Sequence, residues 1–156
     1  MRDPTRRIHS LLLKKNQTLA VAESCTAGLV SYLITRYPGS SRYFLMGISA
    51  YSNKTKESLL NIPHRLISAK GAVSKEIAVM MAQNVRSIIR ADLGIGITGI
   101  AGPSGATRGK PVGTVFIAVS GKERTVWRKF TFRSSRNAVR KMAALESLKL
   151  LETIIK

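Results

Sequence analysis

The stretch AVAESCTAGLV, Ala20 to Val30, joins two apolar segments through an acid, two hydroxyls and a thiol. Residues 17–22 before this corner have the composition of a short buried strand, and residues 27–35 after it have the composition of a helix. A strand that passes directly into a helix is typical of α/β proteins. The stretch therefore predicts a strand-to-helix corner that carries four polar side chains, Glu23, Ser24, Cys25 and Thr26.

The rest of the chain repeats this alternation and then ends differently. Strands are expected over residues 43–50, 92–98, 112–120 and 125–132, the last two as a hairpin, with a bulge or a close backbone approach at Gly47. Helices are expected from Pro4 with Asp3 as cap, over 52–60, after Pro63, after Ser74, and from Ser134 or Ser135. The helix after Ser74 should bury one face, made of Ala78, Met81, Ala82, Val85, Ile88 and Ile89.

This order of elements predicts one α/β domain over residues 1–156. We expect a three-layer α/β/α sandwich with a mixed sheet and helices on both faces. No run is long enough to span a membrane, and the single cysteine excludes an internal disulfide. Cys25 with two scattered histidines, His9 and His64, does not suggest a metal site. We expect a cytoplasmic protein without metal or cofactor.

The net charge of +18, from 26 basic and 8 acidic residues, is the unusual feature of the composition. Such an excess suggests polyanionic partners, but it is equally compatible with a solvated basic surface. Aromatic residues make up only 6%, too few for a row of base-stacking platforms. We therefore expect nucleic acid to bind only nonspecifically.

Two glycine motifs do not fit the functions they suggest. GIGITG matches the dinucleotide pattern through Gly94, Gly96 and Gly99, but two of these glycines fall inside an expected strand instead of opening a helix. Gly109-Lys110 is followed by Pro111 where a P-loop needs a hydroxyl. Neither motif predicts a nucleotide-phosphate loop.

Three loops at strand ends remain as candidates for a site. In the first, Ser24 or Thr26 could act chemically or could only cap the helix. In the second, Lys56 follows Tyr51 and Ser52 and could be a general base if its pKa were lowered, or an ordinary surface lysine. The third, residues 98–105, could hold an anion on its backbone or could be a tight strand exit.

Six blocks of the sequence, in order, carry a resemblance: AESCTAG, PGSSRYF, AYSNKTK, GAVS, TGIAGPSG and KPVGTVFIAVS. They resemble the CinA C-terminal domain family, whose stand-alone members are nicotinamide mononucleotide (NMN) deamidases of the serine type that need no metal. The resemblance is strong over residues 19–119 and continues more weakly into residues 134–140. Ala27 and Ala106 stand where the family has glycine, which puts the substrate preference in doubt.

The resemblance implies that Ser24 attacks the amide, that Lys56 serves as base and then as proton donor to ammonia, and that Tyr51 relays or orients the proton. It implies a pocket shaped by Thr98, the loop from Gly99 through Gly102 to Gly105, and Ser40 with Ser41. The amides of Thr26 and Ala27 would bind the oxyanion, and Arg136 or Arg140 the 5′-phosphate. Glu23 would orient the loop, bind the ribose or pair with Lys56. A homodimer or larger homo-oligomer is expected. The alternative is a non-catalytic member that binds nucleotides or nucleic acid.

Overall fold

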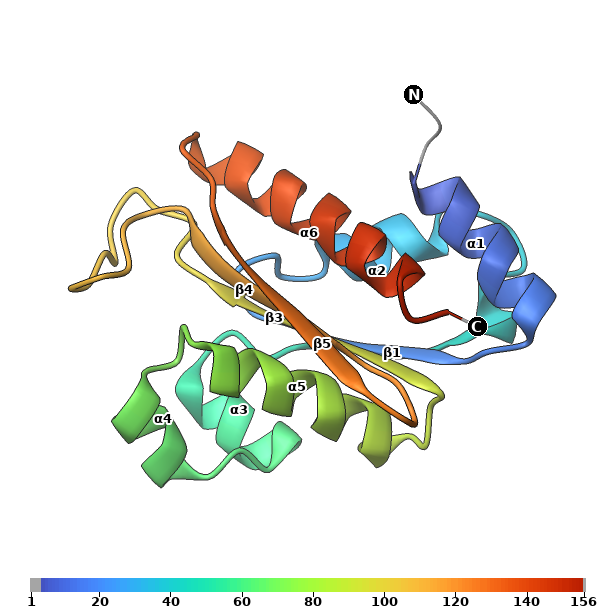
Figure 1. Cartoon of the computed structure of the whole chain (residues 1–156), viewed down its shortest axis with the longest axis horizontal. Helices are drawn as coiled ribbons and strands as arrows, with labels where there is room; N and C mark the ends of the chain where they lie inside the picture. The colour runs from blue at the N-terminus through green and yellow to red at the C-terminus, as the bar shows by residue number, and fades with distance from the viewer. Residues whose placement is uncertain (1–3, 156) are drawn as a thin grey trace.

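A computed structural model describes residues 4–155 and shows a five-stranded sheet between two layers of helices (Figure 1). The strands run in the order β2-β1-β3-β4-β5. β1 pairs in parallel with both β2 and β3, whereas β4 pairs antiparallel with both β3 and β5. Their bounds are β1 Leu19–Glu23, β2 Phe44–Ser49, β3 Leu93–Gly99, β4 Thr114–Ser120 and β5 Thr125–Thr131. The predicted α/β sandwich with a mixed sheet is confirmed.

Helices cover both faces of the sheet (Figure 1). One face carries α1 (Pro4–Lys15), α2 (Leu29–Thr35) and α6 (Arg136–Glu152), and the other carries α3 (Asn53–Leu60), α4 (His64–Lys70) and α5 (Lys75–Ile88). A single 3₁₀ turn, η1 (Ser40–Arg42), precedes β2. Among residues 4–155, no helix is long and apolar enough to cross a membrane.

Most predicted helix starts agree with the structure. The hydroxyls of Ser52 and Ser74 accept hydrogen bonds from the main-chain N–H groups of Thr55 and Ile77, so both predicted caps are confirmed. Ser135 occupies the cap position of α6 without a side-chain hydrogen bond. The predicted cap at Asp3 lies outside the described residues.

Three local predictions need correction. The second helix begins at Leu29 rather than at residue 27, because Ala27 and Gly28 have left-handed backbone conformations, with φ of 47° and 91°. Ile88 and Ile89 are exposed, since the chain leaves α5 there and reverses into β3. The third correction is only partial: the irregularity in β2 falls opposite the Leu19–Ala20 step, and the close approach expected at Gly47 is confirmed, toward Ser31.

The strand β1 is buried on both faces, and its side chains alternate between two cores. Leu19 and Val21 pack with α1, α2 and α6, whereas Ala20 and Ala22 pack with α3, α4 and α5. A strand of this kind has no solvated face, which explains its continuous apolar sequence. It delivers the polar corner at Glu23 and Ser24 to the carboxyl edge of the parallel strands.

The glycines of GIGITG allow α5 to lie directly against β3. A Cβ at Gly94 would stand 2.1 Å from the carbonyl oxygen of Ala82, and one at Gly96 would stand 2.3 Å from that of Ala78. Both glycines are interior positions of β3, as the sequence predicted. Their function is therefore close helix–sheet packing.

We predict that Gly96→Ala destabilises the protein strongly. The added methyl would overlap α5 backbone atoms that cannot move aside, so the free energy of unfolding should fall by about 2 kcal/mol or more in urea titrations. Gly121→Ala is the control, because its φ is outside the left-handed region and the atom nearest to its Cβ position is the side-chain Cγ2 of Ile154, at 3.0 Å, instead of helix backbone. An equal loss at the two positions would contradict the packing explanation.

Candidate active site

The carboxyl ends of the three parallel strands open onto one cavity of about 270 Å³. The loop after β1 contributes Ser24 and Cys25, the loop after β2 contributes Tyr51, and α3 contributes Asn53 and Lys56. The segment before α5 contributes Ala72 and Val73. The β3–β4 loop lines the opposite wall with residues between Thr98 and Gly105, and α6 adds Arg136. Ligand sites of α/β sheets are typically found at this edge.

Lys56 is buried at the base of this cavity and reaches the hydroxyl of Ser24. Its Nζ lies 3.1 Å from Ser24 Oγ, 2.9 Å from the carbonyl oxygen of Ala50 and 3.4 Å from that of Tyr51. Only 1% of the residue is exposed. Although 32 positions separate Ser24 from Lys56, the fold places the two side chains in hydrogen-bond contact.

Burial lowers the pKa of the Lys56 ammonium, because the interior solvates a charge less well than water does. The ionised Cys25 would oppose this shift, but burial raises the pKa of the Cys25 thiol to about 12, so the thiol is neutral near pH 7. In the neutral amine, two N–H bonds can point to the two carbonyls while the lone pair faces Ser24. The arrangement can therefore remove a proton from the hydroxyl.

The residues after Ser24 form a tight turn. The main-chain N–H of Ala27 donates to the carbonyl oxygen of Ser24 at 3.1 Å, so the prediction that this N–H binds an oxyanion is wrong. The N–H groups of Cys25 and Thr26 lie outside that closing bond and donate to no other residue between 4 and 155. The thiol of Cys25 packs with the apolar core, while Thr26 is buried.

Glu23 is fully buried and turned away from Lys56. Its carboxylate accepts hydrogen bonds from the main-chain N–H groups of Gly28, Val30 and Ser31 at 2.9–3.1 Å, and from the Ser31 hydroxyl at 2.8 Å. It thus satisfies the free amides at the start of α2. Of the three roles expected for Glu23, the structure shows the orientation of the loop, and the other two, ribose binding and pairing with Lys56, are wrong. The predicted capping function exists, but Glu23 performs it instead of Ser24 or Thr26.

The two predicted arginines have different positions. Arg136 lines the cavity and donates to the carbonyl oxygen of Gly102 at 2.6 Å and to the Tyr51 hydroxyl at 2.9 Å. The Tyr51 hydroxyl accepts from Arg136 and lines the same cavity as Lys56, while the Tyr51 carbonyl oxygen lies 3.4 Å from Lys56 Nζ. That Tyr51 relays or orients a proton stays a prediction. Arg140 contacts the turn that follows Ser24, where it donates to the carbonyl oxygens of Cys25 and Thr26.

The remaining predicted positions divide between the two edges of the sheet. Gly99 and Gly102 line the cavity, as does Thr98, whose hydroxyl donates to the carbonyl oxygen of Ala72 at 2.8 Å. The pair Ser40 and Ser41 does not, so that prediction is wrong. These serines precede Tyr43, whose carbonyl accepts from Leu19 at the start of β1, and therefore lie at the opposite edge.

Sequence reasoning missed three residues that line the cavity, Asn53, Ala72 and Val73. All three belong to blocks that were recognised, AYSNKTK and GAVS, but no chemistry in the residue types distinguished them. Asn53 is the first residue of α3, one turn before Lys56, and its helical position could have indicated it.

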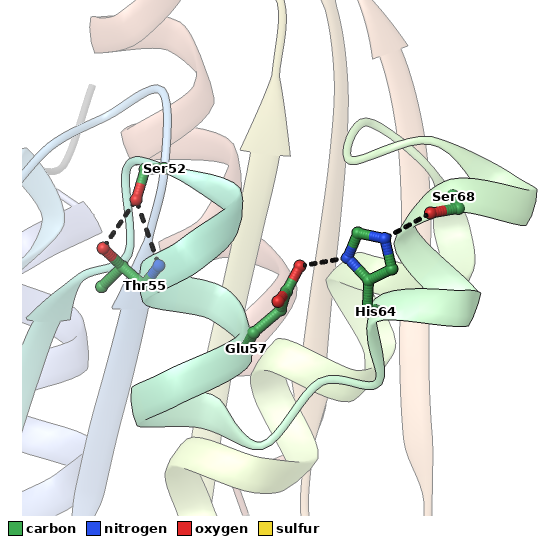
Figure 2. Close-up of polar contacts among 5 residues, drawn as sticks. All are labelled: Ser52, Thr55, Glu57, His64 and Ser68. Carbon is green, nitrogen blue, oxygen red and sulfur yellow. Dashed lines mark hydrogen bonds and ion pairs between the residues drawn. The ribbon is translucent and has the colours of Figure 1, made fainter.

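A second polar arrangement, on α3 and α4, resembles a hydrolase triad (Figure 2). Glu57 Oε1 lies 2.8 Å from His64 Nδ1, and His64 Nε2 lies 3.2 Å from Ser68 Oγ. The His64 side chain is 77% exposed, and none of the three residues lines the cavity. The Glu57–His64 contact joins α3 to α4, and the His64–Ser68 contact lies within α4, so we interpret the arrangement as a surface contact between the two helices. Figure 2 also shows the Ser52 hydroxyl engaged with Thr55 as the helix cap.

The fold and the cavity together define an α/β domain with a buried serine–lysine pair and, within residues 4–155, no group of side chains able to hold a metal ion. The sequence model of the CinA C-terminal domain family matches residues 2–155, so the chain belongs to this family.

Named relatives agree with this assignment. The chain is 48% identical over 140 residues to a CinA-like protein of Desulfotalea psychrophila, covering 90% of this chain but 34% of that protein. The chain thus spans about a third of the length of the curated relatives it matches. Its fold is similar to the competence/damage inducible protein CihA of Agrobacterium tumefaciens, with a TM-score of 0.95 and 29% identity over 98% of this chain and 94% of that one. The fold is also similar to that of a CinA superfamily protein of Escherichia coli, with a TM-score of 0.93 and 26% sequence identity. This match covers 97% of this chain and 88% of that one.

We predict that Glu23→Ala lowers the stability of the whole domain. The change removes a buried acceptor of four hydrogen bonds and leaves the first amides of α2 unpaired, which should cost about 3 kcal/mol in urea unfolding. Glu23→Gln is the matched variant, since it keeps the size and one acceptor oxygen, and it should lose less. Equal stability of the wild type and Glu23→Ala would contradict this role.

Proposed function

We propose that this chain is an amidohydrolase that converts NMN to nicotinic acid mononucleotide and ammonia, with Ser24 as nucleophile and Lys56 as base. The observation that carries the proposal is the buried Lys56 Nζ at 3.1 Å from Ser24 Oγ at the wall of a cavity. Amide hydrolysis needs a strong nucleophile and a proton donor for a poor leaving group. A lysine with a lowered pKa can supply both functions in turn.

The reaction would proceed in two halves. Neutral Lys56 takes the proton of Ser24 while Oγ bonds to the carboxamide carbon, and the carbonyl oxygen becomes an oxyanion. Collapse breaks the carbon–nitrogen bond, and the Lys56 ammonium gives its proton to the departing nitrogen, which leaves as ammonia. Lys56 then deprotonates a water that attacks the ester. The bond between the acyl carbon and Ser24 Oγ then breaks, Lys56 returns the proton to Oγ, and the carboxylic acid is released.

The walls of the cavity suit an anionic nucleotide. Arg136 brings a cation to the cavity, and guanidinium groups match phosphate geometry. In the β3–β4 loop the main-chain N–H groups of Ala101, Gly102, Ser104 and Gly105 donate to no residue between 4 and 155, so they are available to a ligand. The names of the relatives refer to competence and damage rather than to a reaction, so the substrate rests on the six sequence blocks and on this chemistry.

We predict that Ser24→Ala and Lys56→Met each reduce ammonia release from NMN, measured with a chelator present, by about 10³-fold or more. Each change removes one member of the pair that makes the nucleophile. Cys25→Ala is the matched control at the adjacent position, and it should keep activity within a few-fold because the buried thiol is protonated.

Two outcomes would contradict the mechanism. One is a Ser24→Ala protein that keeps the full rate, and the other is a folded wild type that releases no ammonia. In the second case, thermal stabilisation by NMN without turnover would favour the alternative of a nucleotide-binding member without catalysis.

We predict that kcat/KM rises with pH up to the lowered pKa of Lys56, because only the neutral amine acts as base. Stability should follow the same direction. Between the lowered pKa in the folded protein and the ordinary value, the unfolded chain binds more protons, so the free energy of unfolding increases with pH. Urea titrations of wild type and Lys56→Met over pH 6–10 test this. The variant should lose that slope, and identical slopes would contradict a lowered pKa.

A further inference from the structure

A second cavity, of about 500 Å³, lies between the end of α5 and the β4–β5 hairpin. Gln83, Arg86 and Ser87 line it from α5, and residues 120–125 line it from the hairpin. Because β4 runs antiparallel to β3, the hairpin lies at the edge where β3 begins, opposite to the edge that carries Ser24. Within residues 4–155, no residue lines both this cavity and the candidate active site. The chemistry proposed above therefore does not account for it.

Arg86 has a buried donor without an acceptor. Its Nε is buried, and no residue between 4 and 155 accepts a hydrogen bond from it. In the same part of the chain no carboxylate forms an ion pair with this side chain. Buried polar groups of proteins nearly always have a partner in the protein, in ordered water or in a ligand. The partner of Arg86 is therefore to be sought outside residues 4–155.

The end of α5 does not supply the missing acceptor. The carbonyl oxygen of Arg86 accepts from the main-chain N–H of Ala91 at 2.9 Å, and that of Ser87 accepts from Arg90 at 3.2 Å. The side chain of Arg86 starts close to β3, since its Cβ lies 2.7 Å from the position of a Cβ at Gly94. The residue is only partly buried and lines the cavity, so a ligand in the cavity can reach it.

Positive charge is in excess around this cavity. Three cations line it, Arg86, Lys122 and Arg124, together with one acid, Glu123. Asp92, which does not line this cavity, contacts the Lys122 ammonium at 3.1 Å. Even with Asp92 counted, the cations outnumber the carboxylates by three to two. The local field therefore favours an anionic ligand.

The other side chains around the cavity are polar. Gln83 Nε2 donates to Thr125 Oγ1, and this hydroxyl donates to Ser120 Oγ, both at 3.3 Å. Ser87 adds an exposed hydroxyl next to Arg86, and no residue that lines the cavity between 4 and 155 has an apolar side chain. A guanidinium with hydroxyls nearby is a donor set that suits phosphate oxygens. The volume is in the range of small-molecule sites.

We propose that this cavity is a second ligand site, which binds the phosphate group of a small phosphorylated molecule through the Arg86 guanidinium. A phosphate oxygen would give the buried Nε the acceptor that it lacks, and a second oxygen would accept from the same planar fork. The site is separate from the cavity of Ser24 and Lys56. The inference therefore does not depend on the proposed hydrolysis of NMN.

The test uses inorganic pyrophosphate at constant ionic strength, so that the net charge of +18 alone does not produce binding. Calorimetry should show saturable binding, and an NMR titration should shift the main-chain amides of residues 83–87 and 120–125. Arg86→Met should weaken this binding by about 10-fold or more, because it removes charge-assisted hydrogen bonds. Arg65→Met is the matched control. It removes the same charge from an exposed position of α4 and should bind as the wild type does.

Three further measurements separate a ligand site from a structural arginine. Arg86→Lys keeps the charge but has no Nε and no planar fork, so it should bind as weakly as Arg86→Met. Without pyrophosphate, Arg86→Met should melt no lower than the wild type, because it removes a buried donor without an acceptor. Saturating pyrophosphate should raise the melting temperature of Arg136→Met, which lacks the arginine of the active-site cavity, but not that of Arg86→Met.

Several results would overturn the proposal. Amide shifts confined to residues 98–105 would place pyrophosphate in the active-site cavity, and an equal loss of binding in Arg65→Met would mean nonspecific attraction. Wild-type binding by Arg86→Lys, or a lower melting temperature of Arg86→Met without ligand, would show that the guanidinium is not a phosphate ligand. Absence of saturable binding at millimolar pyrophosphate would mean that water alone is the partner of Nε. Failure of NMN hydrolysis would leave these measurements unaffected, so the two proposals stand or fall separately.

Discussion

The contact between Lys56 and Ser24 depends on a lysine amine that is buried among three oxygens of the residues between 4 and 155. Two of those oxygens are the main-chain carbonyls of Ala50 and Tyr51, so the segment that joins β2 to α3 is itself part of the amine's environment. The Ser52 cap sets where α3 begins, and Lys56 then follows one turn later, pointing back toward the strand end. The position of Nζ thus follows from backbone geometry, and Ser24 only needs to be brought to it.

Close packing on both sides of the central strands brings Ser24 there. Alanines on one side of β1 and glycines on the same side of β3 let the α5 layer approach closely. The other side of the strands carries larger residues against α6. The edge at which β1, β2 and β3 end is consequently rigid, and the loops that leave it start from well-determined points. This is the reason that a residue pair 32 positions apart can be held at hydrogen-bond distance.

The sequence located the serine–lysine pair better than the groups that hold it. Residue types at the strand ends made Ser24 and Lys56 candidates but left helix capping and a surface lysine open, and the resemblance to the family decided between these alternatives. The role of Glu23 stayed open among three alternatives, because adjacent side chains at a strand end point to opposite sides and the sequence does not say which side faces the cavity. The structure selects the loop-orienting role. Ser40 and Ser41 were misplaced because a residue before a parallel strand and one after it occur at opposite edges. Arg140 could not be assigned from spacing, since its partners are carbonyl oxygens, which any residue provides.

The alanine at position 27 shows how these supports act together. It does not line the cavity, and neither does Ala106, so neither departure from the family's glycines narrows the pocket. The consequence of Ala27 is conformational, because an alanine must be held at a φ of 47°. Three contacts do this: Ser24 accepts from its N–H, Arg140 binds the two preceding carbonyls, and Glu23 binds the N–H of Gly28 that follows. A turn restrained from all three directions needs no glycine to adopt this shape, so Ala27 is compatible with the same reaction and the same cavity.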